Sequence, residues 1–189
     1  ASGGGISQSE GLARFPWLAF APDGTLYAAW QDDSSGDWEI YVLRWNGSDW
    51  LEVGAGSASG GGISSTNGDS LYPRMDVTSD GTPYVAWDDD TSGDKEIYVR
   101  HWNGSAWAEV GADSATGGGI SNNSGWSGCP KVAIAPDGTP YVTWDEIRER
   151  IGDRRPLVLG YGRGSVREST SANWLELEEG QQAQSGQGE

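Results

Sequence analysis

Two acidic segments in the first half of the chain have the spacing of oxygen ligands for a hard cation. Asp33 and Asp37 lie in one segment and Asp90 and Asp94 in the other, with a serine midway between the two members of each pair. Ca²⁺ takes about six to eight oxygen ligands, often around a turn that contains glycine. These four residues are therefore candidate calcium ligands. The alternative is a solvated hairpin loop in which Asp and Ser accept hydrogen bonds from backbone amides.

Three tryptophans are candidates for carbohydrate binding. Trp17, Trp38 and Trp126 stand next to predicted loops and do not recur at the repeat period of this chain, unlike the seven tryptophans at 30, 45, 50, 87, 102, 107 and 144. A flat aromatic face stacks against the C–H surface of a sugar, while neighbouring carboxylates and amides bind its hydroxyl groups. The alternative is that each ring packs in the core.

One recurring position changes its identity while its neighbours stay the same. The residue after a repeated proline is Trp17, Arg74 or Lys131. At the start of successive inner strands, two cations and a tryptophan would recognise an anionic sugar or another carboxylate. Salt bridges to the many nearby Asp residues are the alternative. We take these three residues as ligand-binding candidates.

Catalytic chemistry finds little support. His101 is the only histidine, and Arg44 occupies its place in the first copy of the repeat. Cys129 lies beside Pro130 in an apolar context, which indicates an inert thiol. The paired carboxylates of a glycosidase cannot be selected among 28 acidic residues without geometry. We therefore assign no catalytic residue from the sequence.

The composition excludes several classes of partner. The chain has 189 residues with 28 acidic and 12 basic side chains, a net charge of −16, which argues against nucleic acids and anionic membrane surfaces. No apolar run approaches the roughly 20 residues of a membrane span. The 30 glycines and 11 tryptophans with only 35% hydrophobic residues favour an all-β chain rich in turns.

An internal repeat organises these residues. Gly-Gly-Gly-Ile-Ser occurs at 3–7, 60–64 and 117–121, so each copy begins 57 residues after the previous one. Asp-Gly and Asn-Gly pairs divide each of the first two copies into four short apolar runs, which predicts two hairpins per copy. In the first copy the strands are expected at 17–20, 25–30, 39–45 and 50–53. Four strands per repeat are typical of β-propeller blades; a β-sandwich does not predict a strict repeat.

The number of repeats raises the question of closure. The predicted units are blade repeats at 1–57, 58–114 and 115–180, followed by a disordered tail at 181–189. Propellers close with about four to eight blades, so three blades leave two open faces. We expect two chains to pair as a homodimer that completes a six-bladed ring. The alternative is a fragment, or a natural half whose partner is a different chain.

The third copy departs from the pattern after Glu146. Six of the ten arginines lie between Arg148 and Arg167, and the Glu-Ile-Tyr-Val run of the other copies is missing. Divergence of a terminal repeat explains this, because capping repeats are commonly atypical. An ancestral frameshift between Glu149 and Leu159 is the alternative, and the gene sequence distinguishes the two.

The second copy resembles the bacterial sialidase-like propeller repeats of the Asp-box type. The resemblance rests on the segments 70–73, 80–81, 84–88, 93–94, 96–98 and 103–107. The Asn-Gly-Ser-x-Trp turn at Asn103 is similar to a degenerate Asp-box hairpin, with Asn in place of Asp. The resemblance implies a propeller fold. Sialidases of this family use three substrate-binding arginines, a Tyr–Glu pair and an acidic Asp. Only Arg74 falls on an expected inner strand, so their active site is not implied.

These observations favour a non-catalytic, lectin-like propeller that binds carbohydrate or another surface ligand outside the cytoplasm, in the extracellular space or the periplasm. A sialidase-like hydrolase whose site forms only in the complete ring is one alternative. A structural repeat module without a ligand is the other. No cofactor is expected apart from Ca²⁺.

Overall fold

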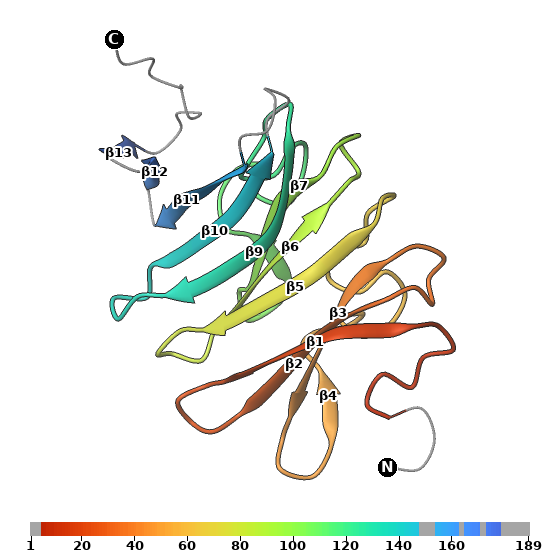
Figure 1. The fold of residues 1–189 in the computed structure, drawn as a ribbon. Coiled ribbons are helices and arrows are strands. Elements are labelled where there is room, and N and C mark those ends of the chain that lie inside the picture. Colours follow the sequence, from red (N-terminus) through yellow and green to blue (C-terminus); the bar gives the residue numbers. More distant parts are fainter. Residues whose placement is uncertain (1–4, 148–153, 163–164, 171–172, 179–189) are drawn as a thin grey trace.

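The computed structural model describes residues 5–147, 154–162, 165–170 and 173–178, and every regular element within these ranges is a β-strand. The strands form three antiparallel sheets (Figure 1). The first sheet contains, in order, β1 (Ala13–Phe20), β2 (Leu26–Asp32), β3 (Glu39–Trp45) and β4 (Trp50–Glu52). The second contains β5 (Ser70–Val77), β6 (Pro83–Asp89), β7 (Glu96–Trp102) and β8 (Trp107–Glu109). The third contains β9 (Trp126–Ile134), β10 (Pro140–Ile147), β11 (Arg154–Gly162), β12 (Ser165–Thr170) and β13 (Asn173–Glu178).

The predicted hairpins are confirmed in the first two sheets, and local turn chemistry explains them. In the β1–β2 turn the Gly24 amide donates to the Ala21 carbonyl at 2.9 Å, and Gly24 has a φ of 86° that favours glycine. In the β3–β4 turn the Asn46 side chain accepts from the amides of Ser48 and Asp49 at 2.9 and 2.7 Å. These bonds hold the chain in a reversal at the points where the sequence predicts one.

The third sheet has five strands, whereas the repeat predicts four. β10 pairs with β11, Trp144 lying opposite Leu157, so the strand next to β10 comes from the part of the chain that has left the repeat. Part of the altered segment, 148–153, and the predicted tail, 181–189, lie outside the described residues.

A β-bulge recurs in the first strand of each sheet. In β1, Arg14 pairs with Gln31 and Trp17 with Ala29, so Phe15 and the proline after it lie opposite a single residue, Trp30. The same irregularity occurs in β5 and β9, and the residue before the proline has a positive φ in all three strands: 50° at Phe15, 54° at Tyr72 and 56° at Cys129. A bulge tolerates proline inside a strand and redirects the neighbouring side chains.

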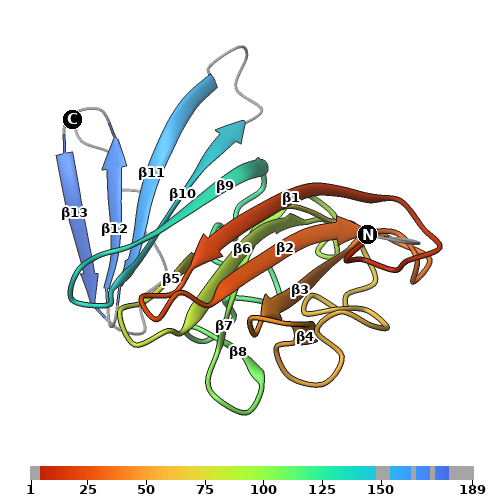
Figure 2. The same cartoon turned by 90° about the horizontal axis from the view of Figure 1, so that it is seen from below.

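The three sheets are arranged like successive blades around an axis, because their first strands β1, β5 and β9 lie side by side (Figures 1 and 2). The main core fills the space between the first and second sheets, where Met75 and Trp87 pack with Ala29 and Val42. A second cluster lies between the second and third sheets. Each junction therefore joins the β2–β3 surface of one sheet to the first two strands of the next.

The Gly-Gly-Gly-Ile-Ser segment seals the edge of the sheet that it leaves. β4 pairs only with Leu43, Arg44 and Trp45, so the first half of β3, which pairs with β2 on one side, has no strand on its outer edge. The amide of Ile63 donates to the Ile40 carbonyl at 2.7 Å, and the Ile40 amide donates to the Ser64 hydroxyl at 2.7 Å. The loop thus satisfies backbone groups that an exposed edge would present to another chain.

In the ranges that the structure describes, no helix is long and apolar enough to span a membrane.

Candidate functional site

The three residues that follow the repeated prolines occupy equivalent places on neighbouring strands. Trp17, Arg74 and Lys131 lie opposite Ala29, Ala86 and Thr143 in β1, β5 and β9. The sequence places them at the starts of these strands. The structure corrects this, because each strand begins several residues earlier and these side chains follow the bulge.

Trp17 and Arg74 are brought together across the first two sheets. The Arg74 guanidinium carbon lies 4.7 Å from the centroid of the Trp17 ring, a cation–π contact. The Trp17 Nε1 donates to the Met75 carbonyl at 2.8 Å, which fixes the ring, and Arg74 Nη1 donates to the Pro73 carbonyl at 2.8 Å. Trp17 is 39% exposed, Arg74 is half-buried and Lys131 is exposed. The pair is therefore an accessible, oriented cation on an aromatic support.

The bulge adds rings and cations that sequence reasoning missed. Phe15 and Tyr72 meet edge to face with centroids 4.8 Å apart, and Lys95 Nζ lies 5.6 Å from the Tyr72 ring centroid. The Lys95 ammonium also pairs with Asp88 at 2.9 Å. The sequence does show aromatic residues, Phe15 and Tyr72, before the first two repeated prolines. The residue types do not reveal the positive φ that redirects these side chains.

Trp38 and Trp126, the other predicted aromatic ligands, lie at the ends of strands. Trp38 precedes β3, and the Arg14 guanidinium carbon lies 5.7 Å from its ring centroid. Trp126 is the first residue of β9, and its indole covers Gly128 so closely that a Cβ there would overlap the ring. Both side chains are half-buried. Sugar binding at these two positions stays a prediction.

The candidate calcium ligands take part in loop hydrogen bonds. Asp33 Oδ1 accepts from the Leu12 amide and Asp90 Oδ1 from the Asp69 amide, both at 2.7 Å, which ties each acidic loop to the segment before the first strand of its own sheet. The carbonyls of Asp37 and Asp94 accept from the serine two residues earlier. Within the described residues no group of three or more His, Cys, Asp or Glu side chains is arranged to hold a metal. Calcium binding stays a prediction, which a calcium titration tests.

A buried carboxylate network crosses the junction between the first two sheets. Glu39, at the start of β3, is only 2% exposed; it accepts from the Ser64 hydroxyl and, at 2.9 Å, from the Thr66 amide. Ser70 donates to Asp89 at 2.7 Å, and its hydroxyl lies 3.4 Å from Glu39 Oε2. Burial raises the pKa of Glu39 to about 7. The Ser64 hydrogen bond acts to lower this pKa, and the charges of Asp37 and Asp89 act to raise it further. Its enclosure indicates a structural role.

The raised pKa predicts a pH-dependent stability. The folded chain holds the Glu39 proton more tightly than the unfolded chain, so this contribution is complete below the unfolded pKa of 4.5 and is lost as pH rises through about 7. Glu39→Gln mimics the protonated acid and removes the loss. We expect the melting temperature of the variant to rise relative to that of the wild type between about pH 5 and pH 8.

Glu52→Gln is the matched control. Partial burial acts to raise the pKa of Glu52, but hydrogen bonds from the Ala58 and Gly56 amides and the Ser59 hydroxyl lower it overall. Its titration is complete below the pH range of the comparison, so the difference from the wild type should stay constant there. Parallel curves for Glu39→Gln and the wild type would contradict the assignment.

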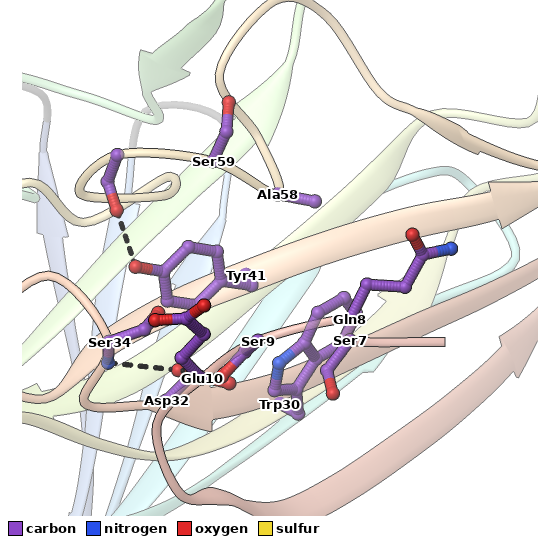
Figure 3. A pocket seen from close by; sticks show the side chains of 11 residues that line it. Ser7, Gln8, Ser9, Glu10, Trp30, Asp32, Ser34, Tyr41, Ala58 and Ser59 are labelled. Atoms are coloured by element: carbon purple, nitrogen blue, oxygen red, sulfur yellow. Dashed lines mark hydrogen bonds between the residues drawn. The ribbon is translucent and has the colours of Figure 1, made fainter. Parts of the chain in front are cut away.

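A cavity of about 290 Å³ opens on the side of the first sheet that faces away from the second (Figure 3). Its walls come from the segment before β1, from β2 and β3, and from the loop after β4. The lining includes Ser9, Trp30, Asp32, Tyr41 and Ser59. Two buried polar atoms there, Trp30 Nε1 and Asp32 Oδ2, have no hydrogen-bond partner.

Comparisons with known proteins identify no family. No family model matches the chain, and no curated protein matches it. Among solved structures, an endo-arabinase from Bacteroides thetaiotaomicron is 14% identical, with a TM-score of 0.49 over 89% of this chain and 62% of the other. A glycoside hydrolase family 43 arabinoxylan arabinofuranohydrolase from Bacillus subtilis is 18% identical, with a TM-score of 0.48 over 83% and 40%. A Hadza microbial sialidase is 15% identical, with a TM-score of 0.47 over 90% and 37%. This chain therefore spans less than two thirds of each of these proteins.

Proposed function

We propose that this chain is a non-catalytic propeller module that binds an anionic carbohydrate, or another anionic surface ligand, across its inner strands. One observation carries the proposal: the Arg74 guanidinium lies 4.7 Å from the Trp17 ring centroid, on the neighbouring inner strand. Lys131 occupies the equivalent place on the third strand. We propose that the chain binds this ligand in the extracellular space or the periplasm.

The chemistry of these groups suits an acidic sugar. A guanidinium binds a carboxylate through two parallel N–H bonds, and an exposed indole face packs against the C–H surface of a sugar ring. Lys131 adds a second, exposed positive charge. With a net charge of −16, most of the surface repels anions, so the cations on the inner strands favour binding at this place over others.

Replacing Arg74 tests the site. We expect Arg74→Gln to weaken binding of a sialyl-lactose probe about tenfold or more, since a hydrogen bond to a charged group contributes about 1.5–3 kcal/mol. Arg44→Gln removes the same charge from β3, where Arg44 pairs with Leu51 of β4, and should leave the affinity unchanged. Isothermal titration calorimetry with sialyl-lactose and neutral lactose measures both effects.

The outcomes separate the alternatives. Equal binding of the neutral and acidic sugars, or equal losses in the two arginine variants, would contradict the assigned site. Hydrolysis of a fluorogenic sialoside by the purified chain would contradict the non-catalytic assignment. No binding to any member of a glycan array that includes acidic sugars would contradict the carbohydrate ligand.

A further inference from the structure

The outward face of the first sheet carries side chains that are buried wherever the same repeat position meets another sheet. Ile6 is 39% exposed, whereas its repeat equivalent Ile63 is 2% exposed. Leu18 is 58% exposed, whereas its equivalent Met75 is 3% exposed and packs on the first sheet. We call this surface, formed by Ile6, Phe15, Leu18 and Trp30, the leading face. It has the composition of a sheet junction without the neighbouring sheet.

The third sheet has the matching surface. In the first sheet, Tyr27 and Gln31 of β2 face the second sheet and are 8% and 3% exposed. Their equivalents in β10 are Tyr141, which is 37% exposed, and Asp145, which is exposed. We call the surface around Tyr141, Thr143 and Asp145 the trailing face. Within one chain, trailing faces meet leading faces at both internal junctions.

One hydrogen bond recurs at both internal junctions. Gln31 Oε1 accepts from the Tyr72 amide at 2.9 Å, and Asp88 Oδ2, one repeat later, accepts from the Cys129 amide at 3.3 Å. The Tyr27 hydroxyl donates to the Gly81 carbonyl at 3.4 Å. The next acceptor in the series is the Asp145 carboxylate on the trailing face. The corresponding donor is the Phe15 amide on the leading face.

An unpartnered carboxylate oxygen marks the same surface independently. In the second sheet, Trp87 Nε1 donates to Asp89 Oδ2 at 3.2 Å, and this aspartate joins the network that contains Glu39 of the first sheet. In the first sheet the equivalent oxygen, Asp32 Oδ2, has no partner and borders the cavity of Figure 3. Trp30 Nε1 is also unpartnered, but so is Trp144 Nε1 at the internal junction, so only the carboxylate oxygen distinguishes the outward face. The cavity lies where a preceding sheet would stand.

We propose that the leading face of one chain binds the trailing face of a second copy. Asp145 of one copy accepts from the Phe15 amide of the other, and Tyr141 donates to the Gly24 carbonyl. Such an interface is heterologous, because different surfaces meet, and two copies close it twice. The product is a ring of six sheets with a continuous row of inner strands. This assembly goes beyond the proposed ligand binding and does not depend on it.

Charge affects the assembly in a defined way. Two chains of −16 repel one another, while the proposed interface buries the exposed apolar side chains of the leading face. Added salt screens the repulsion and strengthens apolar burial. We therefore expect the dimer dissociation constant to fall as NaCl is raised from about 0.02 to 0.5 M, since the Debye length shrinks from about 20 to 4 Å.

Light scattering on the full chain tests the proposal. The expected mass is twice the 20.1 kDa of one chain. Leu18→Glu should give a folded monomer, because Leu18 is 58% exposed in the single chain and is not needed for its core. Leu51→Glu, at a 38% exposed leucine on β4, is the control and should remain a dimer. Circular dichroism and tryptophan fluorescence verify that both variants fold.

A mixing experiment separates head-to-tail pairing from pairing of like faces. Tyr141→Arg disables the trailing face, as Leu18→Glu disables the leading face, and each variant alone should be monomeric. Mixed in equal amounts, they retain one intact interface and should form a dimer. A mixture that stays monomeric, a wild-type mass of one chain at about 100 µM, a wild-type mass above two chains, or a monomeric Leu51→Glu would each overturn the proposal.

Discussion

Replacing Gly62 with alanine is expected to lower the free energy of unfolding by about 3 kcal/mol, because the new Cβ would overlap backbone atoms. Gly62 has a φ of 60°, and a Cβ built there would collide with the Ile40 carbonyl oxygen and touch the Tyr41 ring. That oxygen is the acceptor for the Ile63 amide at 2.7 Å. The loop would have to withdraw from β3 and expose the edge that it seals.

Gly60→Ala is the matched control for this prediction. Gly60 has a similar φ of 57°, but a Cβ there meets no atom within 4 Å. Both alanines bear the cost of a left-handed backbone, about 1–2 kcal/mol, and only Gly62→Ala adds the overlap. Urea unfolding curves at one protein concentration measure the two losses. Equal losses would show that the close contact with β3 contributes nothing.

Trp87→Ala is expected to be the other severe substitution, with a loss of about 4 kcal/mol in the free energy of unfolding. Its ring is fully buried between the first and second sheets, where it packs in one cluster with Ile40, Val42 and Ile63. Its indole nitrogen also donates to Asp89 at 3.2 Å. The substitution leaves a large cavity and removes a donor from the buried carboxylate network.

The control for this substitution is Trp50→Ala on the outer strand β4. Trp50 is half-buried and packs against Trp45, with ring centroids 5.6 Å apart. It lies in the smaller cluster of the first sheet, which contains Trp30, away from the junction with the second sheet. Its loss should be less than half that of Trp87→Ala in the same unfolding experiment. A larger loss at Trp50 would mean that packing within a sheet, and not between sheets, dominates stability.

The repeat made most of the architecture predictable from the residues alone. Turn chemistry is local, so Asp23-Gly24 and Asn46-Gly47 place the reversals at their observed positions. The recurrence of Trp30 and Trp87 indicates the scaffold, and both side chains are buried. The third copy was less predictable, because a pattern that has lost its period does not specify which later segment pairs with β10.

The candidate site was predictable in its members but not in its contacts. Alignment of the repeats identifies Trp17 and Arg74 as equivalent positions. Their contact needs two further facts: the bulge that redirects both side chains, and the neighbouring positions of β1 and β5. The bulge depends on a positive φ at Phe15 and Tyr72, and neither phenylalanine nor tyrosine favours that conformation. The contact between Trp17 and Arg74 therefore depends on long-range packing that the residue types do not specify.

One hydrogen bond recurs between sheets: Gln31 accepts from the Tyr72 amide, and Asp88 accepts from the Cys129 amide one repeat later. This recurrence bears on how such chains change in length. Every junction uses an acceptor at one repeat position and a backbone amide at another, so its chemistry does not depend on where the repeat stands. Duplication of residues 58–114 within the gene would create one more junction with the same donor and acceptor. Chains of this kind can thus gain or lose whole repeats while this hydrogen bond is kept at each junction that remains.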